Sequence, residues 1–353
     1  MKKAVIRGAA LAMAMTAGTA WAGGLWLNEY GDFAGGRAGA GAAAGVDEAM
    51  TIAYNPASIS RLQGNQLFAS AGAVVPQMNF DIQYSNPRNG YGDGGDAGEV
   101  AATSSMAYLH DLDSDTWRAG IAVMPLSGAS MKFHNNWVGR YQATEVSLLL
   151  MALSPTVAYR INDSLSVGAT LQGYYADLEL DFALPRLNPL KQDGKGSIDG
   201  DDLGAGYTLG AMYELSPTMR FGVLYQSKLK IKFGGNLKTN YSDIGPKEQM
   251  DLANSIAVDT DLDMADYARF SVHQDLDEHW SVDFTVGWDN WSTLGSVFVS
   301  TQDGSAGIAT KWKDTYHYAW GAQYALDERW DFTAGIAYDS NPVSSQNRNA
   351  QLP

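Results

Sequence analysis

The segment 219-MRFGVLYQSKLKIKF-233 alternates between apolar and polar side chains over fifteen residues. One parity is almost entirely apolar, with Met219, Phe221, Val223, Tyr225, Leu229, Ile231 and Phe233. The other parity carries Arg220, Gln226, Lys228, Lys230 and Lys232. Because successive side chains of a strand point to opposite faces, the pattern predicts one long strand with an apolar and a polar wall. At ~3.3 Å per residue it would extend ~50 Å, long enough to cross a bilayer and continue beyond it.

The N-terminus predicts export of the chain. Lys2, Lys3 and Arg7 precede a short stretch rich in Ala, Met and Leu that ends in Ala20-Trp21-Ala22. Basic residues, a short apolar run and an A-x-A site are typical of a secretory signal peptide, predicted here as residues 1–22. The alternative is an uncleaved anchor helix, which a short run rich in small residues disfavours. Beyond this segment no apolar run reaches the ~20 residues that a spanning helix needs.

Composition narrows the possible partners. The formal net charge of -15 argues against binding to nucleic acid, whose phosphates would be repelled. The chain has no cysteine, so an exported form cannot rely on disulfides. Its stability must then come from strand pairing and the lipid environment.

Five short turns recur along the chain, about 50 to 60 residues apart, a spacing that fits two long strands and one longer connection. They lie at 112–115, 162–164, 216–218, 277–278 and 327–329. Short turns at one end and long loops at the other are typical of outer-membrane barrels. Trp117, Trp280 and Trp330 lie next to these turns. We expect their rings at the level of the lipid headgroups.

The fold class predicted is therefore all-β, a transmembrane antiparallel β-barrel. Eleven strands are expected, at 66–80, 99–111, 116–126, 141–161, 165–182, 203–215, 219–233, 256–276, 279–293, 310–326 and 330–340. A soluble β-sandwich with one exposed face is the alternative. Bacterial barrels have even strand numbers, so the barrel region, residues 65–353, is expected to be C-terminally incomplete by about three strands.

Residues 23–64 do not resemble a wall strand. Glycines alternate with alanines there, and Asn55-Pro56-Ala57 follows. Small residues permit close backbone packing, so this segment is predicted to fold inside the barrel as a hatch.

In this context the chain resembles the FadL/TodX family of outer-membrane transporters for long-chain fatty acids and other hydrophobic compounds. The Gly/Ala-rich stretch, the acidic residue, the Asn-Pro-Ala and the following Leu62 match its N-terminal hatch. Further similar segments extend over the rest of the mature chain, at 137–141, 155–160, 200–202, 220–222 and 338–343.

The resemblance implies a fourteen-stranded, monomeric barrel closed by its hatch, with about eleven strands present here. It implies contact with outer-membrane lipid and lipopolysaccharide, insertion by the barrel assembly machinery, and no cofactor or metal. Cargo would first meet apolar outer loops, with Leu184, Leu187 and Leu190 in the third and Met250 and Leu252 in the fourth.

An inward kink of the third strand would then open the wall sideways. Carried over to this chain, that kink involves Pro125 and Gly128, with Asn55, Pro56 and Ala57 beside it.

Four basic residues are candidates for contact with an acyl carboxylate. Lys228, Lys230 and Lys232 share the polar parity of one strand and could attract an anion. The alternative, which we favour, places them beyond the membrane in contact with solvent or lipopolysaccharide. Arg140 is either a pocket ligand or half of a structural ion pair.

The function predicted is passive uptake of long-chain fatty acids or related hydrophobic compounds across the outer membrane, with lateral exit through the wall. Leaving water is favourable by ~0.8 kcal/mol per CH₂, so an opening into lipid offers a downhill route. Uptake of aromatic or alkane hydrocarbons is the alternative within transport. A lipid-acting barrel enzyme and a general porin are the other classes, although no grouping of Ser, His and Asp indicates catalysis and the five histidines lack metal-site spacing.

Overall fold

The computed structural model describes residues 24–27, 30–80, 82, 92–185, 192–240, 257–294, 296–301, 304–309, 311–327, 329–344 and 347. Four short helical segments come first, α1 (Phe33–Gly36), η1 (Ala42–Ala44), η2 (Ala49–Ala53) and η3 (Pro56–Arg61). None of the described helices is long and apolar enough to span a membrane. The predicted signal peptide lies outside the described residues.

The rest of the described chain is β-structure in one sheet. Its strands are β1 (Gln66–Val74), β2 (Ala101–Asp111), β3 (Trp117–Lys132), β4 (Glu145–Arg160), β5 (Leu165–Leu184), β6 (Gly194–Ser216), β7 (Met219–Gln226), β8 (Leu229–Asn240), β9 (Ala257–Met264), β10 (Tyr267–Asp275), β11 (Trp280–Asp289), β12 (Ser296–Thr301), β13 (Gly304–Ala309), β14 (Thr315–Asp327) and β15 (Trp330–Asp339). A fifth helical turn, η5 (Trp291–Thr293), follows β11.

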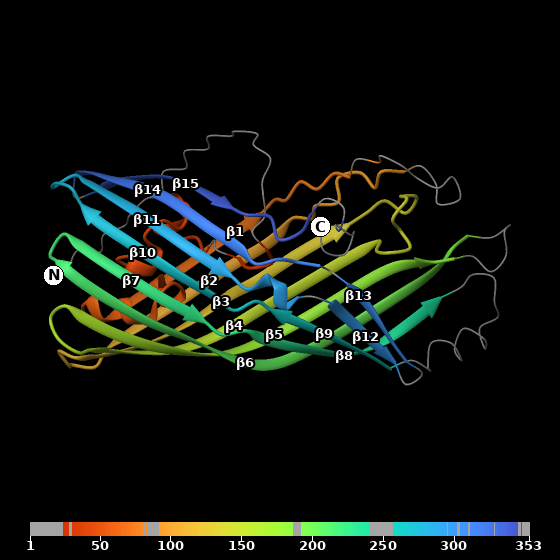
Figure 1. Cartoon of the computed structure of the whole chain (residues 1–353), viewed down its shortest axis with the longest axis horizontal. Helices are drawn as coiled ribbons and strands as arrows, with labels where there is room; N and C mark the ends of the chain where they lie inside the picture. Colours follow the sequence, from red (N-terminus) through yellow and green to blue (C-terminus); the bar gives the residue numbers. More distant parts are fainter. Residues whose placement is uncertain are drawn as a thin grey trace.

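Eleven of these strands are hydrogen-bonded in one continuous path, the wall, in the order β1-β2-β3-β4-β5-β6-β7-β10-β11-β14-β15. The paired strands are antiparallel throughout, so the predicted fold class and the eleven wall strands are confirmed. β8, β9 and the β12–β13 hairpin continue the sheet off this path. Figure 1 shows the strands inclined side by side, with the red and orange hatch enclosed among them near the short turns.

The outer face of the wall is apolar. Large exposed side chains project from neighbouring strands, among them Leu149, Leu171, Leu203, Val223 and Ile336. Trp117, Trp280 and Trp330 are also exposed, and the first two contact the rings of Tyr159 and Tyr324 on adjacent strands. The aromatic rings beside the short turns therefore lie on the outer face, where an interfacial belt requires them.

The prediction that residues 219–233 form one strand with a continuous apolar face is wrong. Val223 and Tyr225 are exposed as expected, but Leu229 and Ile231 are buried and the lysines between them face outward. Gln226 and Ser227 are consecutive and both buried, so the alternation of inward and outward side chains shifts by one residue there. β7 ends at Gln226, and in β8 the apolar side chains point inward. The Ser227 N–H donates to the Tyr207 carbonyl and Ser227 Oγ accepts from the Tyr207 N–H, which holds the junction to β6.

The hatch approaches the wall at glycines. A Cβ on Gly222 of β7 would lie 1.8 Å from the Ala43 carbonyl oxygen, and one on Gly210 of β6 would lie 2.0 Å from Asn55 Oδ1. Only glycine permits such contact between hatch backbone and wall.

Polar side chains of the inner wall complete the attachment. Arg37 Nη1 of the hatch lies 2.8 Å from Asp283 Oδ2 on β11, and both side chains are buried. The Gly41 N–H donates to Thr285 Oγ1 at 2.9 Å, and Arg220 Nε donates to the Ala44 carbonyl at 2.8 Å. Buried polar groups of the hatch thus obtain partners from β7 and β11, which fixes the hatch inside the wall.

Gly222→Ala is expected to destabilise the folded barrel by about 1–3 kcal/mol, because the new methyl group overlaps a hatch carbonyl. The loss should appear as a lower urea midpoint in detergent. Gly173→Ala on β5 is the matched control, since its Cβ would meet nothing nearer than 3.9 Å. Equal midpoints for the two variants would contradict the close packing of hatch and wall.

Candidate functional site

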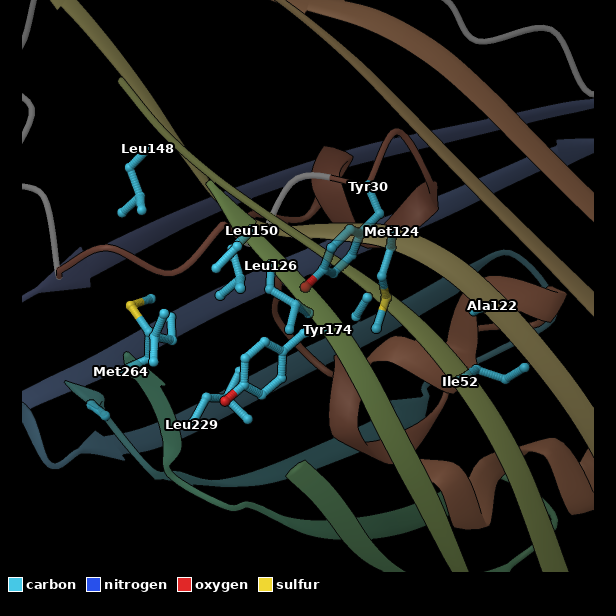
Figure 2. Close-up of a cluster of buried hydrophobic side chains, with 14 of the residues drawn as sticks. Tyr30, Ile52, Ala122, Met124, Leu126, Leu148, Leu150, Tyr174, Leu229 and Met264 are labelled. Carbon is cyan, nitrogen blue, oxygen red and sulfur yellow. The ribbon is translucent and has the colours of Figure 1, made fainter. Parts of the chain in front are cut away.

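Inside the wall, beyond the hatch, lies a continuous cluster of buried apolar side chains that we call the apolar chamber. Strands β3, β4, β5, β8 and β9 supply most of it, and the hatch closes one side. Its larger members include Met124, Leu126, Leu148, Leu150, Tyr174, Leu229, Ile231, Phe233, Leu262, Met264, Trp291, Leu294 and Trp312, with Tyr30, Met50 and Ile52 from the hatch. Figure 2 shows chamber residues as sticks, with labelled side chains from the wall strands and from the hatch.

The change of parity at Ser227 builds part of this chamber. It turns Leu229, Ile231 and Phe233 of β8 inward, where they join the cluster. The apolar face that the sequence predicted for lipid contact in this segment is therefore divided. Its first half meets lipid and its second half lines the interior.

The hydrogen-bonded ladder between β2 and β3 is interrupted. The two strands pair only from Met106 to Asp111, opposite Arg118 to Val123. They approach again through backbone bonds from Glu99 N to Ser130 O at 3.3 Å and from Lys132 N to Ala97 O at 2.8 Å. Between these points, residues 100–105 and 124–129 form no ladder with one another. We call this the wall gap.

A β-bulge in β3 accompanies the wall gap. The register with β4 shifts between Pro125, opposite Met151, and Ser127, opposite Leu150, so Leu126 is an extra residue. Pro125, Leu126 and Ser127 are consecutively buried. A bulge bends its strand, and proline lacks the N–H that a ladder needs. Pro125 and Gly128, the residues expected at the kink, flank Leu126.

A short N-terminal strap, Gly24–Leu27, crosses the interior face of the bulge. The Leu27 N–H donates to the Leu126 carbonyl at 2.9 Å, and Ser127 Oγ donates to the Leu25 carbonyl at 2.6 Å. The strap thus supplies partners to polar groups of β3 that β2 does not reach. Its Trp26 ring points away to Tyr267 and Trp291.

The Asn-Pro-Ala motif was expected beside the kink, but its contacts lie elsewhere. Asn55 Oδ1 caps η3 through the Ala57 N–H at 2.9 Å, and its Nδ2 donates to the Ala43 carbonyl at 2.6 Å and the Ala211 carbonyl on β6 at 3.1 Å. Pro56 lies against Gly168 of β5. These contacts anchor the hatch to β5 and β6. The N-cap asparagine and the first-turn proline also suit the start of a tight helical turn. The strap occupies the position beside the kink.

Arg140 is half of an ion pair. Its Nε lies 2.8 Å from Asp193 Oδ2, and its Nη1 donates to the Trp137 carbonyl at 3.2 Å. Its guanidinium also stacks on the Tyr141 ring at 4.4 Å. The structure therefore gives this residue the structural role that the sequence left as one of two alternatives.

The three lysines do not point into the chamber together. Lys230 and Lys232 are exposed, opposite Asp263 and Asp261 of β9, so they are not carboxylate contacts inside the chamber. Lys228 is half-buried, donates to Thr293 Oγ1 and lies 3.6 Å from Asp263 Oδ2. The parity change places the lysines on the outward face of β8, as in the favoured alternative of contact with solvent or lipopolysaccharide.

The expected outer-loop capture residues are only partly described. Leu184 is the last residue of β5 and is half-buried. Leu187, Leu190, Met250 and Leu252 lie outside the described residues. Within the described part of the chain, no group of three or more His, Cys, Asp or Glu could hold a metal ion.

Sequence reasoning missed the aromatic part of the chamber. Trp26, Trp291 and Trp312 form a chain of ring contacts, with centroids 6.2 Å apart for the first pair and 5.3 Å for the second. Their positions in the sequence lie in predicted hatch, strand end and strand, so no local pattern connects them. The apolar Leu25-Trp26-Leu27 run within a Gly/Ala-rich segment was the one available signal.

Together, the apolar outer face, the cluster of buried apolar side chains and the enclosed hatch define an outer-membrane β-barrel. The chain belongs to the family described as outer membrane protein transport protein (OMPP1/FadL/TodX), whose model matches residues 13–353. It is therefore a protein of the outer membrane. The family's members are transporters and channels, which supports a function other than catalysis at the family level.

Relatives and solved structures agree with this assignment. The chain is 26% identical to the long-chain fatty acid transport protein of Escherichia coli K12 over 380 residues, covering 98% of this chain and 84% of the relative. It is 26% identical to outer membrane protein P1 of Haemophilus influenzae Rd, covering 98% and 82%.

Two crystal structures share the fold. A Pseudomonas aeruginosa FadL homologue superposes with a TM-score of 0.78 at 19% identity, covering 94% of this chain and 84% of that one. The Ralstonia pickettii toluene transporter TbuX gives a TM-score of 0.66 at 18% identity, covering 89% and 87%.

Arg140→Ala and Asp193→Asn are expected to lower the urea midpoint by similar amounts, because either change breaks the same buried ion pair. Neither should weaken binding of hexadecanoate, measured on the purified protein in detergent. A loss of hexadecanoate binding in Arg140→Ala alone would show instead that the arginine contacts cargo.

Asp32 in the hatch gives the protein a predicted pH dependence. Burial raises the pKa of this carboxyl to about 6, against hydrogen bonds from Tyr54 and the Gly35 N–H and the charge of Arg37. Its Oδ2 is buried without a partner. The folded state thus keeps a proton that the unfolded chain releases near the ordinary pKa of 3.8, so stability falls as pH rises through about 6.

Asp32→Asn should abolish this decline. Above pH 6 the free energy of unfolding of the variant should exceed that of the unchanged protein by ~1–2 kcal/mol, as measured by urea unfolding from pH 4 to 8. Asp277→Asn in a short turn is the control with the opposite sign. Backbone N–H groups of His279 and Trp280 lower the pKa of Asp277, so that carboxylate stabilises the fold only above the pH at which it ionises. Parallel pH curves for Asp32→Asn and the unchanged protein would refute the assignment.

Proposed function

We propose that this protein carries long-chain fatty acids or related hydrophobic compounds passively across the outer membrane, from outer loops through the apolar chamber and sideways through the wall gap. The observation that supports this most is the position of the gap. Met124 and Leu126, which line the chamber, belong to the stretch of β3 that β2 leaves unpaired. Chamber and membrane are thus adjacent at one break in the wall.

The hatch argues for a sideways route over an axial one. Arg37, Asn55 and Arg220 connect it to three different wall strands through buried bonds. Expelling it would leave those groups without partners, at about 1–3 kcal/mol each. Within the described residues the strap forms two hydrogen bonds with β3, so we expect it to be the part of the N-terminal region that is displaced at least cost.

Thermodynamics supports the same direction. Acyl chains gain ~0.8 kcal/mol for each CH₂ that leaves water, and the wall gap leads from one apolar environment to another. An aqueous channel would offer no such gain. Transfer from the chamber into the bilayer therefore needs no energy source.

Fatty acids are the first candidate cargo. The E. coli relative is named a long-chain fatty acid transport protein, and the match to it covers 98% of this chain. Monoaromatic hydrocarbons are the second candidate, because the structurally similar TbuX and TodX are toluene transporters. An apolar chamber suits both classes.

Deletion of Leu126 tests the role of the wall gap. Removing the extra residue of the bulge should restore the register of β3 with β4, straighten β3 and bring it towards β2. Uptake of radiolabelled hexadecanoate by cells that produce the variant should fall at least about tenfold, the effect of a barrier raised by ~1.4 kcal/mol.

Deletion of Leu326 is the matched control. It removes the extra residue of another bulge, between Ala325 and Asp327 of β14, close to a short turn and far along the chain from the gap. Both variants must fold, as judged by heat-dependent migration in gels. Normal uptake by a folded Leu126 deletion would exclude the proposed exit.

A further inference from the structure

Two indole N–H groups in the apolar chamber lack hydrogen-bond partners. Nε1 of Trp26, in the strap, and Nε1 of Trp291, in η5, are both buried and unpaired within the part of the chain that the structure describes. Trp291 is fully buried, with 0% of its surface exposed. Buried donors are normally satisfied, and each one left without an acceptor carries a desolvation penalty.

The two rings belong to one site. Their centroids lie 6.2 Å apart with planes inclined at 46°, so the two rings are in contact and both donors belong to one ring cluster. Gly24 lies directly against the edge of Trp291, where an added Cβ would come within 2.2 Å of Nε1. Apolar side chains of the chamber surround the pair, and the Tyr267 ring lies 5.6 Å from that of Trp26.

A cation that contacts η5 is already paired. Lys228 donates to Thr293 Oγ1, two residues after Trp291, and pairs with Asp263 at 3.6 Å. An acidic ligand in the chamber would therefore depend on neutral donors to hold its oxygen atoms. Trp26 and Trp291 provide such donors.

We infer that Trp26 and Trp291 bind the oxygen-bearing end of the cargo, so that the chamber selects long-chain carboxylic acids over hydrocarbons of the same length. The inference rests on the proposed function, because it assigns the cargo class of the same chamber. A carboxyl oxygen would satisfy both donors, whereas an alkane would leave them unpaired. The acyl chain would then lie along the leucine and methionine side chains towards the wall gap.

Trp291→Phe tests this directly, since it keeps an aromatic ring and removes the N–H. Binding of radiolabelled hexadecanoic acid to the purified full-length protein should weaken about tenfold, which corresponds to ~1.4 kcal/mol. Binding of radiolabelled hexadecane should stay the same or improve. Trp26→Phe should give the same selective loss and provides a second variant if the first does not fold.

Trp312→Phe is the matched control. It removes the same bulk from the same ring cluster, but Trp312 is not one of the two unpaired donors. Trp312→Phe should weaken the binding of hexadecanoic acid and of hexadecane to equal extents, or weaken neither. Equal loss of acid and alkane in Trp291→Phe, or no loss of acid, would overturn the inference while leaving transport of hydrophobic cargo intact. If the unchanged protein binds neither ligand, the proposed function itself fails.

Discussion

Backbone hydrogen bonding at membrane depth is the constraint on which the rest of this structure depends. Lipid cannot satisfy N–H and C=O groups, so a spanning sheet has to pair them internally. Between β2 and β3 the ladder is interrupted, and the strap supplies part of what is missing, because the Leu27 N–H donates to the Leu126 carbonyl. With the bond from Ser127 Oγ to the Leu25 carbonyl, it connects β3 to the N-terminal segment.

That arrangement divides the interior into two regions with different chemistry. Near the short turns, buried ion pairs and backbone bonds hold the hatch to β6, β7 and β11. Beyond the hatch, methionine, leucine and tryptophan side chains fill the chamber. A lateral route requires a hatch that is held in place and an apolar region beside a break in the wall. Cargo can then pass without displacing the hatch.

Much of the fold could be predicted from the sequence, because strand alternation and turn spacing are local signals. The exposed Trp117, Trp280 and Trp330 and the eleven wall strands follow from them. Alternation separates the two faces of a strand but does not say which one faces lipid. The two consecutive buried residues Gln226 and Ser227 therefore reversed the predicted inward and outward faces for Leu229 and the lysines. Asn55 and the tryptophans depend on contacts between distant segments, which no local pattern encodes. The resemblance suggested the kink near Pro125, whereas the strap beside it came from the structure alone.

Photo-crosslinking from the lipid-facing surface measures the lateral route most directly. A photoreactive amino acid at Ser104, on the outer face of β2 beside the wall gap, would be compared with one at Tyr175, an exposed position on β5 that is paired with both Met151 and Leu203. If cargo leaves through the wall gap, radiolabelled hexadecanoate taken up by cells labels position 104 well in excess of position 175. Equal labelling at the two positions would contradict the lateral route.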